Sequence, residues 1–360
     1  MTQESKQTPH SLNLKVGDLV EIRQPLEILS TLDDSGALEG LPFMPEMLQY
    51  AGKRFRVYKR AHKACDTIGW TGLRKMKDAV HLDILRCDGQ SHDGCEAGCL
   101  LFWKEAWLKQ VSTGSPDPSL PSEEEVHRAH DLLMQHTQST ERDEQGQEII
   151  RYKCQATEMG RATSPLPWWD LRQFWEDWSC GNVTLRMMAR SFFVALFNKL
   201  QVIRRGVQYP YIEGFLTKTS GEAIGLKAGE LVRVKPKIEI MKTLNKRNRN
   251  RGLSFDREMV KYCGGTYRVQ RRIYKIVNDQ TKIMMRLPND CIVLDGVICQ
   301  GDLNKFCPRS ILPYWRETWL ERVPPNSQER GATPSPIWRE IWLDLTTRNP
   351  QKTNSERDPG

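Results

Sequence analysis

Residues 15–20 have the sequence Lys-Val-Gly-Asp-Leu-Val, and residues 227–232 have the sequence Lys-Ala-Gly-Glu-Leu-Val. Gly229 follows Gly17 by 212 positions, and the same spacing pairs many bulky residues further along the chain without a gap. The pairs include Leu41 with Leu253, Phe43 with Phe255, Met47 with Met259, Tyr50 with Tyr262, Trp103 with Trp315, Glu105 with Glu317, Trp107 with Trp319 and Leu108 with Leu320. A register kept over so many large side chains predicts two related copies, each about 100 residues long, the size of one domain.

Each copy begins with a pattern that is typical of a β-strand. Leu19, Val20 and Ile22 are apolar and lie between glycine and proline, and Phe55 and Val57 alternate with basic residues in a second predicted strand. Short strands separated by turns are typical of small barrels. The sequence therefore predicts an α+β fold, in which two tandem-related, small β-barrel-like (SH3-like) domains are joined by a mostly helical segment.

Four parts of the chain follow from this pattern. Residues 12–111 form the first β-rich repeat with a cysteine cluster, and residues 112–215 form a helical, tryptophan-rich insert. Residues 225–323 form the second β-rich repeat, and residues 324–360 form a flexible tail with a short helix. Within the insert, a capping box at Ser122 and Glu125 starts a predicted helix. A second helix is predicted for residues 184–204, and its apolar stripe is expected to be core rather than a ligand groove.

Composition excludes some classes of protein. The chain has 360 residues, 39% of them hydrophobic, and its 11 tryptophans argue against a disordered protein. The N-terminal ten residues lack an apolar segment of the secretory type, and the most apolar run, residues 192–197, is too short to span a bilayer. We expect a cytoplasmic protein without a membrane partner. Ten cysteines in that setting favour thiols or metal ligands over disulfides.

Residues 87–108, CDGQSHDGCEAGCLLFWKEAWL, place thiols and an imidazole beside an apolar segment. This arrangement predicts a metal site, and zinc is the expected metal because it prefers thiolate and imidazole ligands. The candidate ligands are His62, Cys65, Cys87, His92, Cys95 and Cys99. Four protein ligands would make the site structural, whereas three ligands and a water would permit hydrolytic chemistry. Buried or redox-active thiols remain the alternative to a metal.

The second copy keeps Cys299 and Cys307 at the positions of Cys87 and Cys95. It has Tyr274, Val277, Asn304 and Ile311 in place of His62, Cys65, His92 and Cys99. The second site is therefore expected to be degenerate, although Cys263 and Cys291 are alternative ligands there.

The sequence limits the function of the protein less than it limits the candidate metal site. The leading hypothesis is a zinc-binding module without catalytic activity that binds nucleic acid or an acidic protein through basic strand faces and the basic run of residues 246–251. The alternative is a metal- or thiol-dependent enzyme that uses Cys65, Cys87, Cys95 and Cys99, with Cys154 as a further candidate. A third reading is a scaffold that binds a protein partner through Trp338 and Trp342. No P-loop, GxGxxG, GxSxG or HExxH motif occurs in the sequence.

Several long motifs resemble a family of uncharacterised bacterial proteins. They are LEGLPFMPEM, RFRVYKRAHKACDT, VHLDILRCDG, GCEAGCLLFWKEAWL and YKCQATE, which together span the first copy and the start of the insert. The family pattern has the form CDGxxxxGCxAxCLxFWKEAWL. The resemblance implies no activity, and no functional residue is carried over from it.

Overall fold

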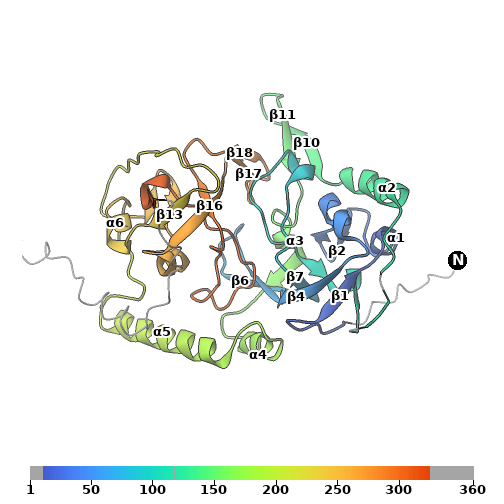
Figure 1. Ribbon diagram of the computed structural model, residues 1–360, viewed down its shortest axis with the longest axis horizontal. Helices are drawn as coiled ribbons and strands as arrows, with labels where there is room; N and C mark the ends of the chain where they lie inside the picture. Colours follow the sequence, from blue (N-terminus) through green and yellow to red (C-terminus); the bar gives the residue numbers. More distant parts are fainter. Residues whose placement is uncertain (1–10, 113, 117, 325–360) are drawn as a thin grey trace, which may run out of the picture. The chain divides into compact units, whose positions relative to one another are not determined.

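The computed structural model describes residues 11–112, 114–116 and 118–324 (Figure 1). The chain divides into two compact units. The first unit contains Met1–Leu185 together with two later segments, Ile273–Asn289 and Ile298–Pro313, and the second unit contains Arg186–Arg272, Asp290–Val297 and the chain from Tyr314 onward. Two segments of the predicted second copy therefore belong to the first unit.

The first unit is built on a five-stranded antiparallel sheet with the strand order β8-β7-β4-β1-β9. In β1, Val20 lies opposite Phe55 of β4 on one side and opposite Gln110 of β9 on the other. The strands are β1 (Leu19–Ile22), β4 (Arg54–Arg60), β7 (Ala79–Leu82), β8 (Trp103–Lys104) and β9 (Leu108–Gln110).

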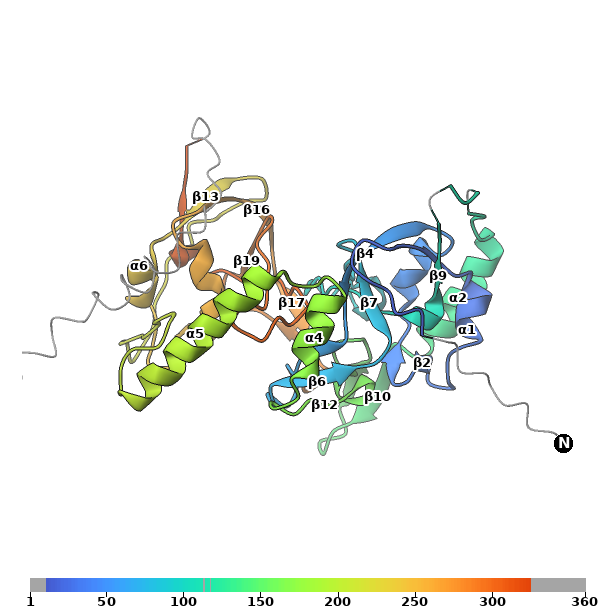
Figure 2. The same ribbon diagram turned by 90° about the horizontal axis from the view of Figure 1, so that it is seen from below.

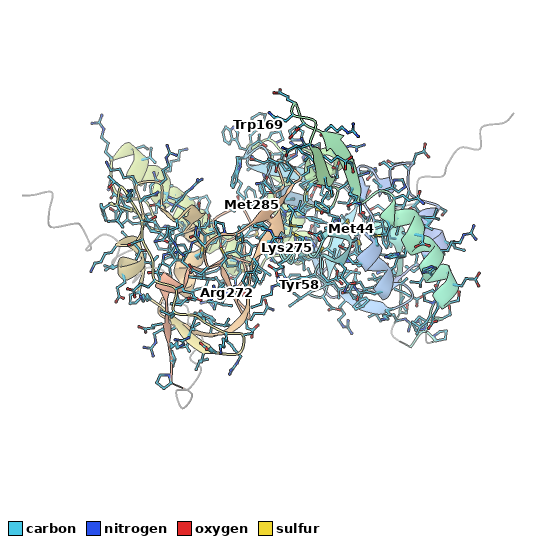
Figure 3. All side chains as sticks on the ribbon, turned by 90° about the horizontal axis from the view of Figure 1, so that it is seen from above. Met44, Tyr58, Trp169, Arg272, Lys275 and Met285 are labelled. Atoms are coloured by element: carbon cyan, nitrogen blue, oxygen red, sulfur yellow. The ribbon has the colours of Figure 1, made fainter. Side chains whose placement is uncertain are left out.

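Smaller antiparallel sheets complete the first unit. A three-stranded sheet has the order β12-β6-β5 (Figure 2), and three two-stranded sheets are β2-β3, β10-β11 and β17-β18. Lys275 and Met285, on β17 and β18, are labelled in Figure 3. The strands are β2 (Ala37–Leu38), β3 (Leu41–Pro42), β5 (Lys63–Cys65), β6 (Leu73–Met76), β10 (Gln138–Arg142), β11 (Glu148–Tyr152), β12 (Thr163–Pro165), β17 (Lys275–Val277) and β18 (Met284–Arg286).

The second unit has a four-stranded antiparallel sheet with the order β19-β16-β13-β20. Leu231 lies opposite Arg268 in this sheet, and Leu19 lies opposite Arg56 in the first unit, so the pairing recurs 212 positions later. The strands of the second unit are β13 (Leu231–Val234), β14 (Arg249–Asn250), β15 (Leu253–Ser254), β16 (Thr266–Arg272), β19 (Ile292–Leu294) and β20 (Leu320–Arg322).

The helices are short apart from α2 and α5. Ser122 Oγ accepts a hydrogen bond from the Glu125 N–H at 3.2 Å, which confirms the predicted start of α2. The α-helices are α1 (Pro25–Leu29), α2 (Glu123–Met134), α3 (Met159–Ala162), α4 (Arg172–Ser179), α5 (Leu185–Ile203) and α6 (Lys237–Met241). The 3-10 helices are η1 (Pro45–Tyr50), η2 (Gln90–His92), η3 (Glu105–Trp107), η4 (Arg257–Tyr262) and η5 (Glu317–Trp319).

Tryptophan pairs lie at the centre of each core. Trp107 is fully buried, packs edge-on against Phe43 at 5.1 Å between ring centroids, and donates its indole N–H to Thr31 at 3.0 Å. In the second unit, Trp319 packs in the same way against Phe255 at 5.3 Å and donates to Thr243 at 2.9 Å. A buried indole N–H needs such a partner, because leaving a polar group unpaired inside a core is costly.

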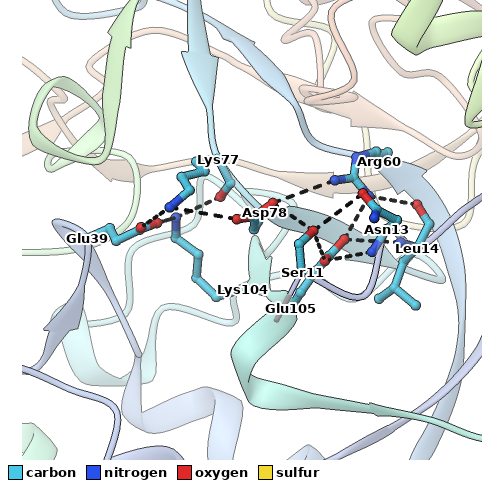
Figure 4. Close-up of polar contacts among 9 residues, drawn as sticks. All are labelled: Ser11, Asn13, Leu14, Glu39, Arg60, Lys77, Asp78, Lys104 and Glu105. Carbon is cyan, nitrogen blue, oxygen red and sulfur yellow. Dashed lines mark hydrogen bonds and ion pairs between the residues drawn. The ribbon is translucent and has the colours of Figure 1, made fainter. Parts of the chain in front are cut away.

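The buried carboxylate of Glu105 binds the backbone of the segment that precedes β1 (Figure 4). Glu105 is 2% exposed and accepts hydrogen bonds from the backbone N–H groups of Asn13 and Leu14, each at 3.1 Å. Arg60 neutralises it at 2.7 Å. In the second unit, Glu317 accepts from the Leu226 N–H at 3.0 Å and pairs with Arg272.

The predicted fold class is wrong. Helix and strand each account for 24% of the residues, and neither main sheet of the described residues closes into a barrel. In the first unit, β8 and β9 are the two edge strands of the five-stranded sheet and do not pair with each other. The strands β5 and β6 belong to another sheet, in which β6 pairs with β12 and with β5. The segment between the predicted barrels also carries β10, β11 and β12, so it is not mostly helical.

The apolar stripe of α5 is not core, contrary to the prediction. Leu185, Phe192, Leu196 and Leu200 are exposed, and Phe192 is 64% exposed. Val194 is the buried residue of this helix. Residues 325–360 of the predicted tail, with Trp338 and Trp342, lie outside the described residues. Within the described part of the chain, no helix is both long and apolar enough to cross a membrane.

Candidate metal centre

Glu46, Cys87 and His92 come together in the first unit. One ligand atom of each residue lies within 4.8 Å of the others, and this is the one such cluster of three or more metal-binding side chains among the described residues. Glu46 is on η1, His92 is the last residue of η2, and Cys87 lies on the loop between β7 and η2. The three donors therefore come from two regions about forty residues apart in sequence.

The loop that carries Cys87 and His92 depends on a tight turn at Gly89. This residue has φ of 76°, and a Cβ atom there would lie 2.0 Å from the carbonyl oxygen of Cys95. Only glycine fits such a close backbone approach in the left-handed region. The Cys87 N–H also donates to the Cys99 carbonyl at 2.8 Å, which ties the two ends of the loop together.

The imidazole of His92 is oriented as in a metal ligand. Its Nε2 lies 3.2 Å from the carbonyl oxygen of Lys153, so this nitrogen carries the proton and donates it. Its Nδ1 has no hydrogen-bond partner although it is buried, and it lies 3.5 Å from Glu46 Oε1. Histidines that bind metals usually donate their second ring N–H to a carbonyl or carboxylate in this way, which leaves the other lone pair for the metal.

The carboxylate of Glu46 is the acceptor at the centre of the cluster. It accepts from the Cys87 thiol at 2.9 Å and from the Ser91 hydroxyl. Burial opposes ionisation of Glu46, but the adjacent imidazole of His92 and the hydrogen bonds from Cys87 and Ser91 outweigh it and hold the pKa below its usual range. Glu46 is therefore an anion in the interior.

The thiol of Cys87 is neutral in the absence of a cation. Burial raises its pKa far above the usual range, and the negative charge of Glu46 raises it further. A metal ion reverses this preference, because it binds the thiolate and displaces the proton.

Two of the six predicted ligands, Cys87 and His92, belong to this cluster. Cys95 instead accepts a hydrogen bond from the Val277 N–H at 3.3 Å, and burial raises its pKa. Burial raises the pKa of Cys99 to about 12. The Cys65 N–H donates to the sulfur of Cys307 at 3.2 Å.

The remaining predicted ligand, His62, faces a different buried group. Its Nε2 lies 3.3 Å from Asp177, which forms a fully buried ion pair with Lys63 at 2.5 Å. Burial, followed by the charges of Lys63 and Arg60, lowers the pKa of His62 to about 3. Burial also raises the pKa of Asp177 to about 6, although Lys63 opposes this change.

Sequence reasoning missed Glu46. The candidate ligands predicted from the sequence are all cysteine or histidine, and most lie near residue 87. Glu46 precedes that region by about forty residues. Pro45 marks the start of a helix in the sequence, but that signal does not identify Glu46 as a ligand. Cys87 was predicted as a ligand because it lies in the same loop as His92.

Comparisons with family models, with curated proteins and with solved structures found no match.

Proposed function

We propose that the protein binds one zinc ion at Glu46, Cys87 and His92, and that this ion stabilises the first unit. One observation carries the proposal, namely the buried Nδ1 of His92, which has no hydrogen-bond partner and faces Glu46. A buried polar atom without a partner is costly in a folded protein. A metal ion supplies the missing partner.

The donor set favours zinc. A thiolate, an imidazole and a carboxylate are all common zinc ligands, whereas calcium and magnesium prefer oxygen ligands alone. The charges also balance, because one thiolate and one carboxylate neutralise a divalent cation. That balance matters in the interior, where an unpaired charge is strongly disfavoured.

The cluster supplies three protein ligands among the described residues, so a fourth coordination position is open, and the burial of its donors is what favours a structural role over a catalytic one. Glu46 is 8% exposed and His92 is 1% exposed, whereas Cys87 is partly exposed, so two of the three donors are closed off from solvent. The ion would link η1 to the loop of Cys87, and such a link contributes directly to folding. The alternative is a metal-dependent enzyme, in which a water molecule completes three protein ligands and reacts with a substrate.

The test measures zinc content and thermal unfolding of the full chain and of His92→Asn, which introduces the residue found at position 304. We expect one zinc per native chain, none in the variant, and a Tm that rises with added zinc in the native chain alone. Cys263→Ser, remote from the three donors in sequence, is the matched control and keeps its zinc. Cobalt is a second probe, since a thiolate-to-cobalt absorption band should require Cys87. A native chain that binds neither ion would refute the proposal.

Zinc affinity should also depend on pH. Binding displaces the proton of Cys87, whose pKa is raised, so affinity rises with pH. The expected slope is about tenfold per pH unit for one displaced proton, measured by competition with a chromophoric chelator. Cys87→Ser should lose both this slope and most of the affinity.

We further propose that the chain contains an internal duplication. The recurring strand pairings, the matched contacts of Trp107 and Trp319 and the matched carboxylates Glu105 and Glu317 support it. The second copy has Asn304 in place of His92, so the proposal predicts one zinc per chain and not two.

A nucleic acid or an acidic protein is the proposed partner of this module. In the first unit, Arg54 and Arg60 are paired with Glu21 and Glu105, and within the basic run of residues 246–251 Arg251 is paired with Asp290. The exposed residues Lys246, Arg247 and Arg249 of this run are the candidate surface. Binding of a polyanion through phosphate contacts would weaken steeply with salt. A flat dependence of affinity on salt concentration would exclude it.

A further inference from the structure

Cys65 and Cys307 form a thiol pair outside the proposed zinc site. Cys65 is the last residue of β5, and its N–H donates to the sulfur of Cys307 at 3.2 Å. Cys65 is partly exposed, whereas Cys307 is buried. Both residues belong to the first unit, although 242 positions separate them.

A buried guanidinium lies beside this pair. Arg309 is 6% exposed, donates to the Cys65 carbonyl at 3.0 Å and to the Thr67 hydroxyl at 3.1 Å, and lies 3.9 Å from the sulfur of Cys65. Among the described residues, no carboxylate lies within ion-pair distance of Arg309. A buried cation needs an anionic partner. The thiolate of Cys65 is placed to provide it.

The two sulfurs are chemically unequal as a result. The hydrogen bond with Cys307 lowers the pKa of Cys65 to about 6, and the charge of Arg309 acts in the same direction, although burial opposes both. The same hydrogen bond and burial raise the pKa of Cys307. One thiol is thus a nucleophile near neutral pH, and its neighbour is a protonated thiol in contact with it.

We propose that Cys65 and Cys307 are a redox-active pair, which a low-molecular-weight disulfide such as oxidised glutathione converts into an intramolecular disulfide. Cys65 is the attacking thiol and Cys307 the resolving thiol. The pair would connect a strand of the first predicted copy to a loop of the second. Neither residue is part of the zinc cluster, so this inference is independent of the proposed function.

The reaction proceeds by two exchanges. The Cys65 thiolate attacks one sulfur of oxidised glutathione, the S–S bond breaks, and one glutathione leaves as a thiolate. Cys307 then loses its proton to water and attacks the sulfur of Cys65, which expels the second glutathione as a thiolate. The two cysteines lose two electrons in total, and the glutathione disulfide gains them and becomes two thiols after protonation.

The fold contains its own control for this site. Val277 occupies the position equivalent to Cys65, and its N–H donates to the sulfur of Cys95 at 3.3 Å, just as Cys65 donates to Cys307. The position equivalent to Arg309 is Ala97. Cys95 therefore accepts the same backbone hydrogen bond but lacks both the second thiol and the guanidinium. Burial raises its pKa, and we expect it to stay unreactive.

The first test uses the native, zinc-supplemented full chain. The reduced protein is treated with oxidised glutathione at pH 7, quenched with acid, alkylated, digested and analysed by mass spectrometry. We expect a linked peptide that joins Cys65 to Cys307, together with release of two glutathione thiols. This measurement needs no variant. Linkage of other cysteines, or no linkage while free glutathione disulfide remains, would overturn the proposal.

Variants then assign the two roles. Cys307→Ser should stop at the first step and carry one glutathione on Cys65, whereas Cys65→Ser should form neither product. Arg309→Met should slow alkylation of Cys65 by iodoacetamide at pH 7 by about tenfold, because fewer molecules carry the thiolate. Cys95→Ser, at the matched position, should react like the native chain. Glutathione bound to Cys307 in the Cys65→Ser variant would reverse the assignment and contradict the proposal.

Discussion

His92 and Asn304 occupy equivalent positions in the two predicted copies. They differ in that His92 has a ring nitrogen, Nδ1, whose lone pair can bind a metal ion. The imidazole donates through Nε2 to the Lys153 carbonyl and leaves Nδ1 buried without a partner. An asparagine amide cannot reproduce this arrangement, because its oxygen is a far weaker ligand for zinc. The proposed binding of zinc by the first copy and not by the second therefore depends on this one side chain.

A second histidine, His81, gives a prediction about pH. It is fully buried, its Nδ1 lies 2.8 Å from the Leu101 carbonyl, and burial lowers its pKa to about 3. Between pH 6.5 and about 3, the unfolded chain binds a proton here that the folded chain does not bind. The free energy of unfolding should therefore fall as the pH falls through this range, by about 1.4 kcal/mol per pH unit from this residue.

The measurement compares urea unfolding at several pH values for the native chain and for His81→Gln. The variant should show a shallower loss of stability on acidification. His127 is exposed, and His127→Gln should keep the native pH dependence. An unchanged slope in His81→Gln would contradict the assignment.

The ion pair of Lys63 and Asp177 gives a prediction about stability. Both side chains are fully buried, and their charged atoms are 2.5 Å apart. Lys63→Met leaves an uncompensated carboxylate inside the first unit, so we expect a loss of about 3–5 kcal/mol in the free energy of unfolding. Lys63→Met combined with Asp177→Leu removes both charges and should cost less than the single change. A double variant less stable than Lys63→Met would argue against this account.

At the residue level, sequence identified part of the candidate site. Cys87 and His92 were predicted because they lie close together in one loop. Glu46 was not predicted, because its place beside them depends on how η1 packs. The partnership of Cys65 with Cys307 was also out of reach, since nothing in a single sequence brings together residues 242 positions apart.

At the level of elements, local signals predicted helix ends well. Ser122 and Glu125 predicted the start of α2, because capping depends only on residues three positions apart. The sheet of β12, β6 and β5 was not predicted, because β12 pairs with a strand almost ninety residues earlier. The apolar stripe of α5 shows a further limit, since periodicity identifies a face but not whether that face is covered.

The cap of α2 can be tested directly. Ser122→Ala removes the acceptor for the Glu125 N–H, so we expect a loss of about 1 kcal/mol in the free energy of unfolding. Ser122→Asp should restore most of it, because aspartate accepts the same bond and favours a helix N-terminus. Urea unfolding of the three proteins measures both effects. Equal stability of the alanine and native proteins would show that the cap contributes nothing.

At the level of the whole molecule, the first unit is not continuous in sequence. It includes Ile273–Asn289 and Ile298–Pro313, and contacts join these segments to its earlier part. Lys282 accepts a backbone hydrogen bond from Tyr152 at 2.8 Å and forms an ion pair with Glu158 at 2.5 Å. Thr67 donates to Asp279 at 2.5 Å, which joins two positions 212 residues apart. The predicted tandem arrangement did not include such an exchange of segments.

A chain that ends at residue 215 tests this organisation. It retains all the predicted zinc ligands of the first copy but lacks the two later segments of the first unit. We expect a lower Tm than in the full chain and binding of a hydrophobic dye, because the surfaces that these segments cover become exposed. The test compares thermal unfolding and dye fluorescence of the two chains with zinc present. A truncated chain as stable as the full one would contradict the assignment of the segments to the first unit.

The discontinuity of the first unit also has a consequence for synthesis on the ribosome. The chain emerges from its N-terminus at about 5–20 residues per second, and domains usually fold as they emerge. Here Cys65 leaves the ribosome long before Cys307, and the first unit is complete only after the segment that ends at Pro313 has emerged. During that interval the surfaces that these later segments contact stay exposed on the nascent chain. The order of translation thus makes the first unit one of the last parts of this protein to be completed.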